Sequence, residues 1–97
     1  MSYEVINQMD INILIVEDEK ILAMTMKKML ISLGYKVVGT VSSGEKALQK
    51  ISEEKPSLVL MDVRLKGPIN GIEVAEKLTG FYNIPVIYIT AYEDKKT

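Results

Sequence analysis

Cysteine and histidine are both absent from this sequence. The absence of cysteine excludes disulfides, thiolate nucleophiles and cysteine-based metal sites. The absence of histidine excludes serine–histidine and cysteine–histidine catalysis, imidazole proton shuttles and most zinc sites. Any chemistry must therefore come from carboxylates, hydroxyls, lysines and the backbone.

Long hydrophobic runs and an excess of positive charge are also missing. No stretch approaches the roughly 18–20 apolar residues of a membrane helix, and residues 1–10 hold no apolar segment of the signal-peptide type. Twelve basic and thirteen acidic residues give a net charge of −1, and the scattered lysines form no patch for nucleic acid. We expect a cytoplasmic protein that binds neither membranes nor nucleic acid directly.

What the sequence does contain is the composition of one small globular domain. Its 97 residues are 47% hydrophobic and 26% charged, which is ordinary for a folded domain. Residues 1–10 show no hydrophobic periodicity and are expected to be an N-terminal lead-in. The domain itself is expected to span residues 11–97.

Two kinds of hydrophobic pattern alternate from residue 11 onward. Short, nearly continuous apolar runs are typical of strands buried on both faces, whereas apolar residues three and four apart indicate helices. Strands are predicted at 11–16, 36–41, 57–61 and 84–89, and helices at 19–33, 42–54 and 72–80. This alternation predicts right-handed βαβ units. The expected fold class is therefore α/β, a doubly wound parallel sheet in a sandwich with helices on both faces.

Several of these elements have signals at their ends. Gly34 stands where a glycine ends the first helix. Ser42, with Glu45 three residues later, forms a capping box for the second helix, and Pro56 keeps that helix from continuing. Asn70 is the expected N-cap of the third helix.

Acidic and hydroxyl side chains come directly after three of the strands. Glu17 and Asp18 follow the first strand, Asp62 follows the third and Thr90 follows the fourth. Because the carboxyl ends of parallel strands meet at one edge of the sheet, where ligands bind, we expect these side chains to converge. The alternative is that each carboxylate only caps the N-terminus of the next helix.

A cluster of three carboxylates needs a balancing cation, unless one of them is protonated. Oxygen ligands without nitrogen or sulfur favour Mg²⁺, with Mn²⁺ as the second choice. A divalent ion beside an aspartate suits phosphoryl transfer, because it screens the approach of two anions and holds the transferring oxygens. In that case the Thr90 hydroxyl would donate to a phosphoryl oxygen.

Four motifs, in this order, resemble the receiver domain of two-component response regulators. They are ILIVEDE, LVLMDVRL, NGIE and VIYITAY, and the resemblance runs from Ile11 to Thr97. It implies a flavodoxin-like fold in which Asp62 is the phospho-acceptor. The donor would be a sensor histidine kinase or a phosphotransfer domain.

The same resemblance implies roles for the neighbouring residues. Glu17, Asp18 and Asp62 would hold Mg²⁺ together with the backbone carbonyl of Arg64. Thr90 would be the switch hydroxyl, and Ala91 the small residue that leaves access to the phosphoryl group. Glu17 stands where the family more often has aspartate, a change that a bridging water can absorb.

One departure from the family concerns the end of the sequence. The family has a fifth strand, ending in a lysine and a proline, and a fifth helix, which residues 91–97 cannot supply. We expect the receiver to lack its fifth βα unit and so to be incomplete at its C-terminus. The sequence would then be a piece of a regulator with an output domain or of a sensor kinase, or a truncation whose partner supplies the edge. The uncovered strand at 84–89 predicts association with a second copy.

Three functions follow from these observations. The first is a phosphorylated receiver in a phosphorelay, with no enzymatic activity beyond its own Mg²⁺-dependent phosphorylation and dephosphorylation. The second is a receiver-like binding module that is not phosphorylated. The third is a phosphatase with an aspartyl-phosphate intermediate, a class that usually has a second aspartate where this sequence has Arg64.

Overall fold

The computed structural model describes residues 10–65, 67 and 69–89, and within them four parallel strands form one sheet in the order β2-β1-β3-β4. This order is that of a flavodoxin-like sheet as far as it extends, and it confirms the α/β prediction. Helices alternate with the strands along the chain. The elements are β1 (Asn12–Val16), α1 (Lys20–Ser32), β2 (Lys36–Val41), α2 (Gly44–Glu53), β3 (Leu58–Asp62), α3 (Gly71–Lys77), the π-helical turn η2 (Leu78–Tyr82) and β4 (Val86–Ile89).

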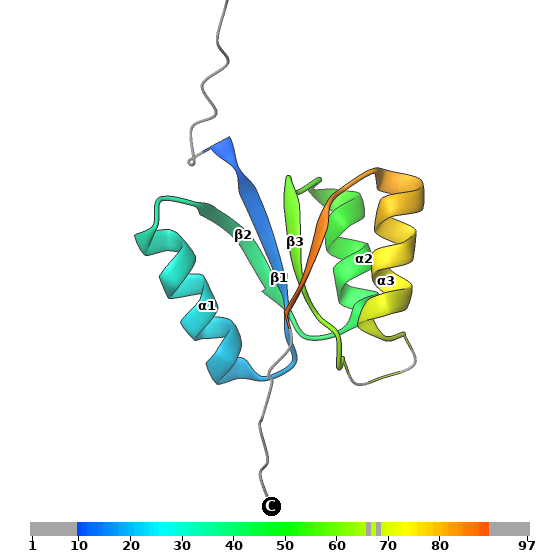
Figure 1. The fold of residues 1–97 in the computed structure, drawn as a ribbon, viewed down its shortest axis with the longest axis horizontal. Coiled ribbons are helices and arrows are strands. Elements are labelled where there is room, and N and C mark those ends of the chain that lie inside the picture. Colours follow the sequence, from blue (N-terminus) through cyan, green and yellow to red (C-terminus); the bar gives the residue numbers. More distant parts are fainter. Residues whose placement is uncertain (1–9, 66, 68, 90–97) are drawn as a thin grey trace, which may run out of the picture.

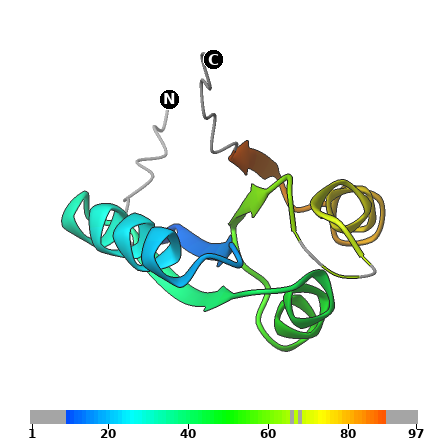
Figure 2. The same ribbon diagram turned by 90° about the horizontal axis from the view of Figure 1, so that it is seen from below.

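The sheet lies between helices on both of its faces (Figure 1). Helix α1 covers one face over β1 and β2, and α2 and α3 lie side by side on the other face (Figure 2). Strand β1 is central, pairing with β2 on one side and β3 on the other. The run from Ile13 to Val16 is completely buried, as the apolar pattern predicts for a strand covered on both faces.

The main core fills the space between the sheet and helices α2 and α3. Strand residues that point toward this side are fully buried, and each such side chain contributes about 1.5–3 kcal/mol through burial. The core residues are Leu14, Val16, Ala47, Ile51, Val59, Met61, Leu65, Val74, Leu78 and Ile84.

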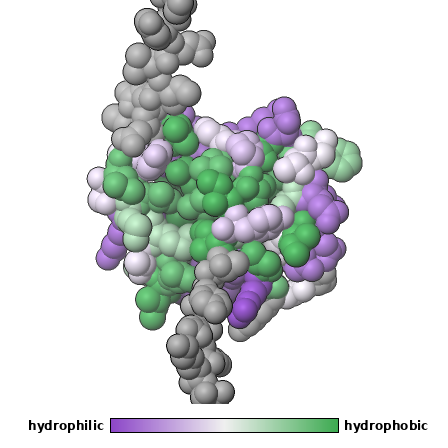
Figure 3. Space-filling view, viewed as in Figure 1, coloured by the Kyte–Doolittle hydropathy of each residue, from purple (hydrophilic) through white to green (hydrophobic). Residues whose placement is uncertain are grey.

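Helix α1 packs much less closely than its sequence pattern predicts. Only Ala23 is buried, Leu22, Met26 and Leu30 are half-buried, and Met29 and Leu33 are 57% and 55% exposed. Among the described residues no helix covers the half of this face formed by β3 and β4. Hydrophobic side chains accordingly gather at the centre of this face, Ile87 of β4 being 52% exposed (Figure 3).

The predicted helix ends are confirmed at two positions and corrected at one. Asn70 caps α3, its Oδ1 accepting from the Glu73 N–H at 2.9 Å, and Gly34 has the left-handed φ of 97° expected of a terminating glycine. The cap of α2 is Ser43, whose Oγ accepts from the Lys46 N–H at 3.2 Å. The Ser42 assignment was wrong because α2 begins at Gly44, one residue later than a Ser42 cap requires, which leaves Ser42 as a connecting residue.

The third helix also continues further than predicted. Helix α3 runs into η2 and ends at Tyr82, two residues beyond Gly80. The chain then turns at Asn83, which has a left-handed φ of 56°, and enters β4. No helix in the described part of the chain is long and apolar enough to cross a bilayer.

Candidate functional site

Three carboxylates meet at the carboxyl ends of β1 and β3, as the sequence predicts. One oxygen of each of Glu17, Asp18 and Asp62 lies within 4.8 Å of the other two. Glu17 and Asp62 are only 5% and 6% exposed, and they are the buried charged residues of the described chain. Because Val16 of β1 pairs with Met61 of β3, the acidic residues that follow are brought side by side.

Backbone N–H groups hold two of these carboxylates in place. The N–H of Glu19 donates to Glu17 Oε2 at 3.0 Å, and the N–H of Arg64 donates to Asp62 Oδ1 at 2.9 Å. Both donors come from residues two positions further along the chain, so each carboxylate is oriented by its own connecting loop.

In the described part of the chain no basic side chain forms an ion pair with these carboxylates. The one ion pair there joins Lys50 and Glu54, at the C-terminal end of α2. Burial raises the pKa of Glu17 from its ordinary value of 4.5 to about 7. The hydrogen bond from Glu19 lowers that pKa, whereas the charge of Asp62 and hydrogen bonds with Asp18 and Asp62 raise it further. The site therefore favours either a proton or a cation.

The residues fit a hard divalent cation. Three carboxylate oxygens converge, and the sequence has no histidine or cysteine to add a nitrogen or thiolate ligand. This set suits Mg²⁺, which binds one or two carboxylates and keeps several waters. The two buried carboxylates also give a physical reason for a cation, since it would offset the cost of burying their charges.

The start of α3 lies directly against the backbone of Asp62. A Cβ atom added to Gly71 would overlap the Asp62 carbonyl oxygen and stand 3.1 Å from Met61 Cγ. Gly44, at the start of α2, is similarly close to the Ile69 carbonyl oxygen, with 2.8 Å for an added Cβ. Glycine at these two positions therefore lets α3 pack tightly against the end of β3 and α2 against the loop that follows Asp62.

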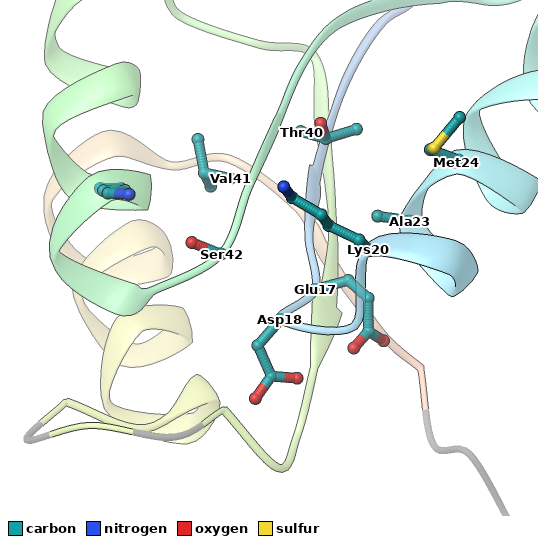
Figure 4. A pocket seen from close by; sticks show the side chains of 9 residues that line it. Glu17, Asp18, Lys20, Ala23, Met24, Thr40, Val41 and Ser42 are labelled. Carbon is teal, nitrogen blue, oxygen red and sulfur yellow. The ribbon is translucent and has the colours of Figure 1, made fainter.

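A cavity of about 410 Å³ opens beside the acidic cluster, a feature that the sequence patterns did not indicate. Glu17 and Asp18 form one end, and Lys20 extends from them toward Thr40 and Val41 of β2 (Figure 4). Ser42, predicted to be a helix cap, lines this cavity together with Lys46. Asp62 does not line it, so the cavity flanks the cluster on the β2 side.

Two of the predicted site residues lie outside the described residues. These are Thr90 and Ala91. Arg64 is exposed, and its N–H is engaged with Asp62. The proposed role of its carbonyl stays a prediction.

The family model of the response regulator receiver domain matches residues 13–97. The chain belongs to this family. Among solved structures, it resembles the receiver domain of a modulated diguanylate cyclase from Desulfovibrio desulfuricans, with a TM-score of 0.82 and 38% identity over 87% of this chain. It also resembles the response regulator PhyR from Brucella abortus, with a TM-score of 0.80 and 37% identity over 89% of this chain. These similarities confirm the flavodoxin-like receiver fold.

Curated relatives of this receiver domain are longer proteins. The chain is 34% identical to the phyllosphere-induced regulator PhyR of Methylorubrum extorquens over 95% of its length, but spans 35% of that protein. It is 38% identical to the response regulator GacA of Pseudomonas viridiflava, of which it spans 40%. It covers 67% of the solved Desulfovibrio receiver chain and 35% of the Brucella PhyR chain.

Proposed function

We propose that this receiver domain takes a phosphoryl group on Asp62 from a phosphohistidine of a sensor histidine kinase or a phosphotransfer domain. The observation that carries the proposal is the convergence of Glu17, Asp18 and Asp62, two of them buried, at the carboxyl edge of the sheet. Such an edge is the usual ligand site of open parallel sheets. The described chain offers no basic side chain paired with this cluster.

Asp62 and Arg64 would have different roles in the transfer of the phosphoryl group. A carboxylate oxygen of Asp62 forms the new bond to phosphorus as the bond to the donor imidazole nitrogen breaks and the imidazole leaves. The Arg64 N–H orients the nucleophile by holding Oδ1. Glu17, Asp18 and Asp62 would hold Mg²⁺, which would supply screening of the negative charges during the transfer.

The metal ligands are proposed to be Glu17, Asp18 and Asp62, joined by the backbone carbonyl of Arg64. Mn²⁺ would serve in the same place, since both ions favour oxygen ligands. Thr90 is proposed as the switch hydroxyl and Ala91 as the small residue that leaves room for the phosphoryl group. The phosphorylated domain would then shift between two states that a partner distinguishes.

Acetyl phosphate, a small phosphoryl donor, tests the proposal directly. The chain is incubated with it in the presence and absence of Mg²⁺, and intact mass spectrometry counts the phosphoryl groups. We expect one group per chain, formed only with Mg²⁺. If no phosphoryl group is taken up with Mg²⁺, the domain is a binding module that is not phosphorylated. Turnover of small phosphate esters would instead favour the phosphatase.

Replacing Asp18 by alanine is expected to weaken Mg²⁺ binding by about tenfold or more, because losing even a residue that supports a metal ligand costs 10–100-fold. Titration calorimetry with Mg²⁺ measures the change. The matched control is Glu19→Ala, since the exposed Glu19 side chain makes no capping hydrogen bond. Equal affinities in the two variants would remove Asp18 from the ligand set.

The stability of the metal-free domain is expected to fall as the pH rises from 4.5 to about 7. The pKa of Glu17 in the folded domain lies above its ordinary value, so the protonated form favours folding. This contribution is complete below pH 4.5 and is lost as the pH rises through about 7. Thermal unfolding with a chelator measures the change.

Other carboxylates also titrate in this range, so the pH experiment needs matched variants. Glu17→Gln keeps an oxygen to accept from Glu19 but cannot ionise. It should lose most of this pH dependence and, near pH 7, be more stable than the unchanged domain. Glu19→Gln should leave the pH dependence unchanged. An unaltered slope in Glu17→Gln would show that another group titrates.

Strand β4 forms one edge of the described sheet, and we propose that this edge, with residues 84–89, joins two copies of the chain. The exposed Ile87 side chain supports this proposal, because an uncovered apolar edge strand favours pairing with another chain. We further propose a cytoplasmic location, which the use of a kinase as donor requires, and no direct contact with nucleic acid.

A further inference from the structure

The π-helical turn η2, which follows α3, lies at the end of the molecule opposite the carboxyl ends of β1 and β3 (Figure 1). The Leu78 carbonyl accepts from the N–H of Asn83, and from that of Ile84 at 3.2 Å. These bonds hold the turn that carries Phe81, which is 83% exposed and is the one phenylalanine in the sequence. Such π turns are rare and are found often at functional sites.

Two hollows lie next to Phe81. The first has a volume of about 460 Å³ and is lined by Leu48, Lys77, Phe81 and Tyr82. The second has a volume of about 330 Å³ and is lined by Glu73, Glu76, Lys77, Gly80 and Phe81. Phe81 and Lys77 line both hollows, so they form the ridge between them. We call the residues that line the two hollows, taken together, the Phe81 surface.

The charge along the Phe81 surface changes sign across this ridge. Lys77 is the only charged residue lining the first hollow, whose other walls are apolar or aromatic. The second hollow has two carboxylates, Glu73 and Glu76, against the same lysine. Within the described chain Lys77 forms no ion pair. Its ammonium group is therefore available to a ligand.

The surface is preformed rather than built on a loose loop. Helices α2 and α3 contact each other, and Leu78 and Tyr82 anchor η2, since Leu78 is completely buried and Tyr82 packs against the core. The two helices also start in tight contact, because Gly44 lies close to Val74 of α3 as well as to Ile69. A rigid aromatic ridge is well suited to serve as an anchor for binding.

We propose that the Phe81 surface docks a peptide segment of a partner protein that places an apolar side chain against Phe81. An acidic side chain of the segment would enter the first hollow beside Lys77, and a basic one would lie over Glu73 and Glu76. The charge pattern of the two hollows selects this class of ligand over a uniformly charged one. The surface lies at the C-terminal end of α3 and in η2, whereas Asp62 lies against the start of α3.

The test is selection from a random peptide library displayed on phage, with the 97-residue chain as the target. We expect enrichment of peptides with an apolar residue between an acidic and a basic one. Titration calorimetry of a synthetic enriched peptide should give an affinity that Phe81→Ala lowers by about tenfold or more, as for an aromatic anchor. Lys77→Glu should reverse the preference, favouring a peptide in which lysine replaces the acidic residue.

The matched control is Ile21→Ala, because Ile21 of α1 is also 83% exposed but belongs to a helix on the other face of the sheet. This variant should bind like the unchanged chain, and all variants should melt at the same temperature. Enriched peptides without the charge pattern, or binding that survives Phe81→Ala, would overturn the proposal. A dimer that Phe81→Ala converts to a monomer would assign the surface to a second copy and would overturn it too.

Discussion

Replacing Asp62 by asparagine is expected to abolish phosphorylation of the domain by acetyl phosphate. The amide has nearly the shape of the carboxylate and can still accept the 2.9 Å hydrogen bond from the Arg64 N–H. It lacks the negative charge that makes the oxygen a nucleophile. Since Asp62 is buried beside Glu17 and Asp18, the change also relieves repulsion, so the variant should fold at least as well as the unchanged domain.

Intact mass spectrometry after incubation with acetyl phosphate and Mg²⁺ measures this effect, and circular dichroism confirms the fold. Glu19→Gln provides the control, because it removes a nearby but exposed carboxylate and should leave phosphorylation unchanged. A phosphoryl group that persists in Asp62→Asn would place the acceptor at another residue. Loss of the label in both variants would mean that the cluster needs its overall charge rather than this one nucleophile.

Gly71→Ala is expected to destabilise the domain by about 2–4 kcal/mol, a large effect for one methyl group. The new Cβ would overlap the carbonyl oxygen of Asp62 and crowd Met61 Cγ at 3.1 Å. The Asp62 oxygen belongs to the backbone of a paired strand, so it cannot move without disturbing β3. Either α3 shifts away from the sheet or β3 is distorted, and both outcomes lose core packing.

Urea unfolding of Gly71→Ala measures this loss, with Gly80→Ala as the matched control. Gly80 has no atom within 4 Å of an added Cβ, so alanine there should be neutral or stabilising by up to about 1 kcal/mol. Equal unfolding midpoints for the two variants would contradict the contact between α3 and Asp62. A destabilised Gly71→Ala that also takes up phosphate slowly would show that this contact positions the acceptor.

The strands and the convergence of the acidic residues were predictable from the sequence. The run from Ile13 to Val16 is apolar and ends abruptly in Glu17, so both the buried strand and the position of its polar end are encoded locally. The sheet then brings Asp62 to the same edge through its parallel register. No knowledge of distant contacts is needed for this step beyond the βαβ rule.

Features that depend on tertiary packing, or on a choice between two similar adjacent residues, were less predictable from the sequence. Either Ser42 or Ser43 has the hydroxyl that a cap needs, and the start of α2 at Gly44 decides between them. The sequence pattern predicts that the third helix ends at Gly80. Packing of Leu78 and Tyr82 on the core instead continues the helix as η2. The raised pKa of Glu17 depends on burial and on Asp62, neither of which its own sequence neighbours specify.

The position of β1 at the centre of the sheet links the acidic cluster to the pairing of β1 with β3. Both β2 and β3 add to β1, and pairing with β3 is the step that brings Asp62 to Glu17 and Asp18. Repulsion among the carboxylates therefore opposes that one pairing step and none of the others. A cation that binds the cluster would reduce this repulsion. It would therefore stabilise the pairing of β1 with β3, in addition to its proposed part in phosphoryl transfer.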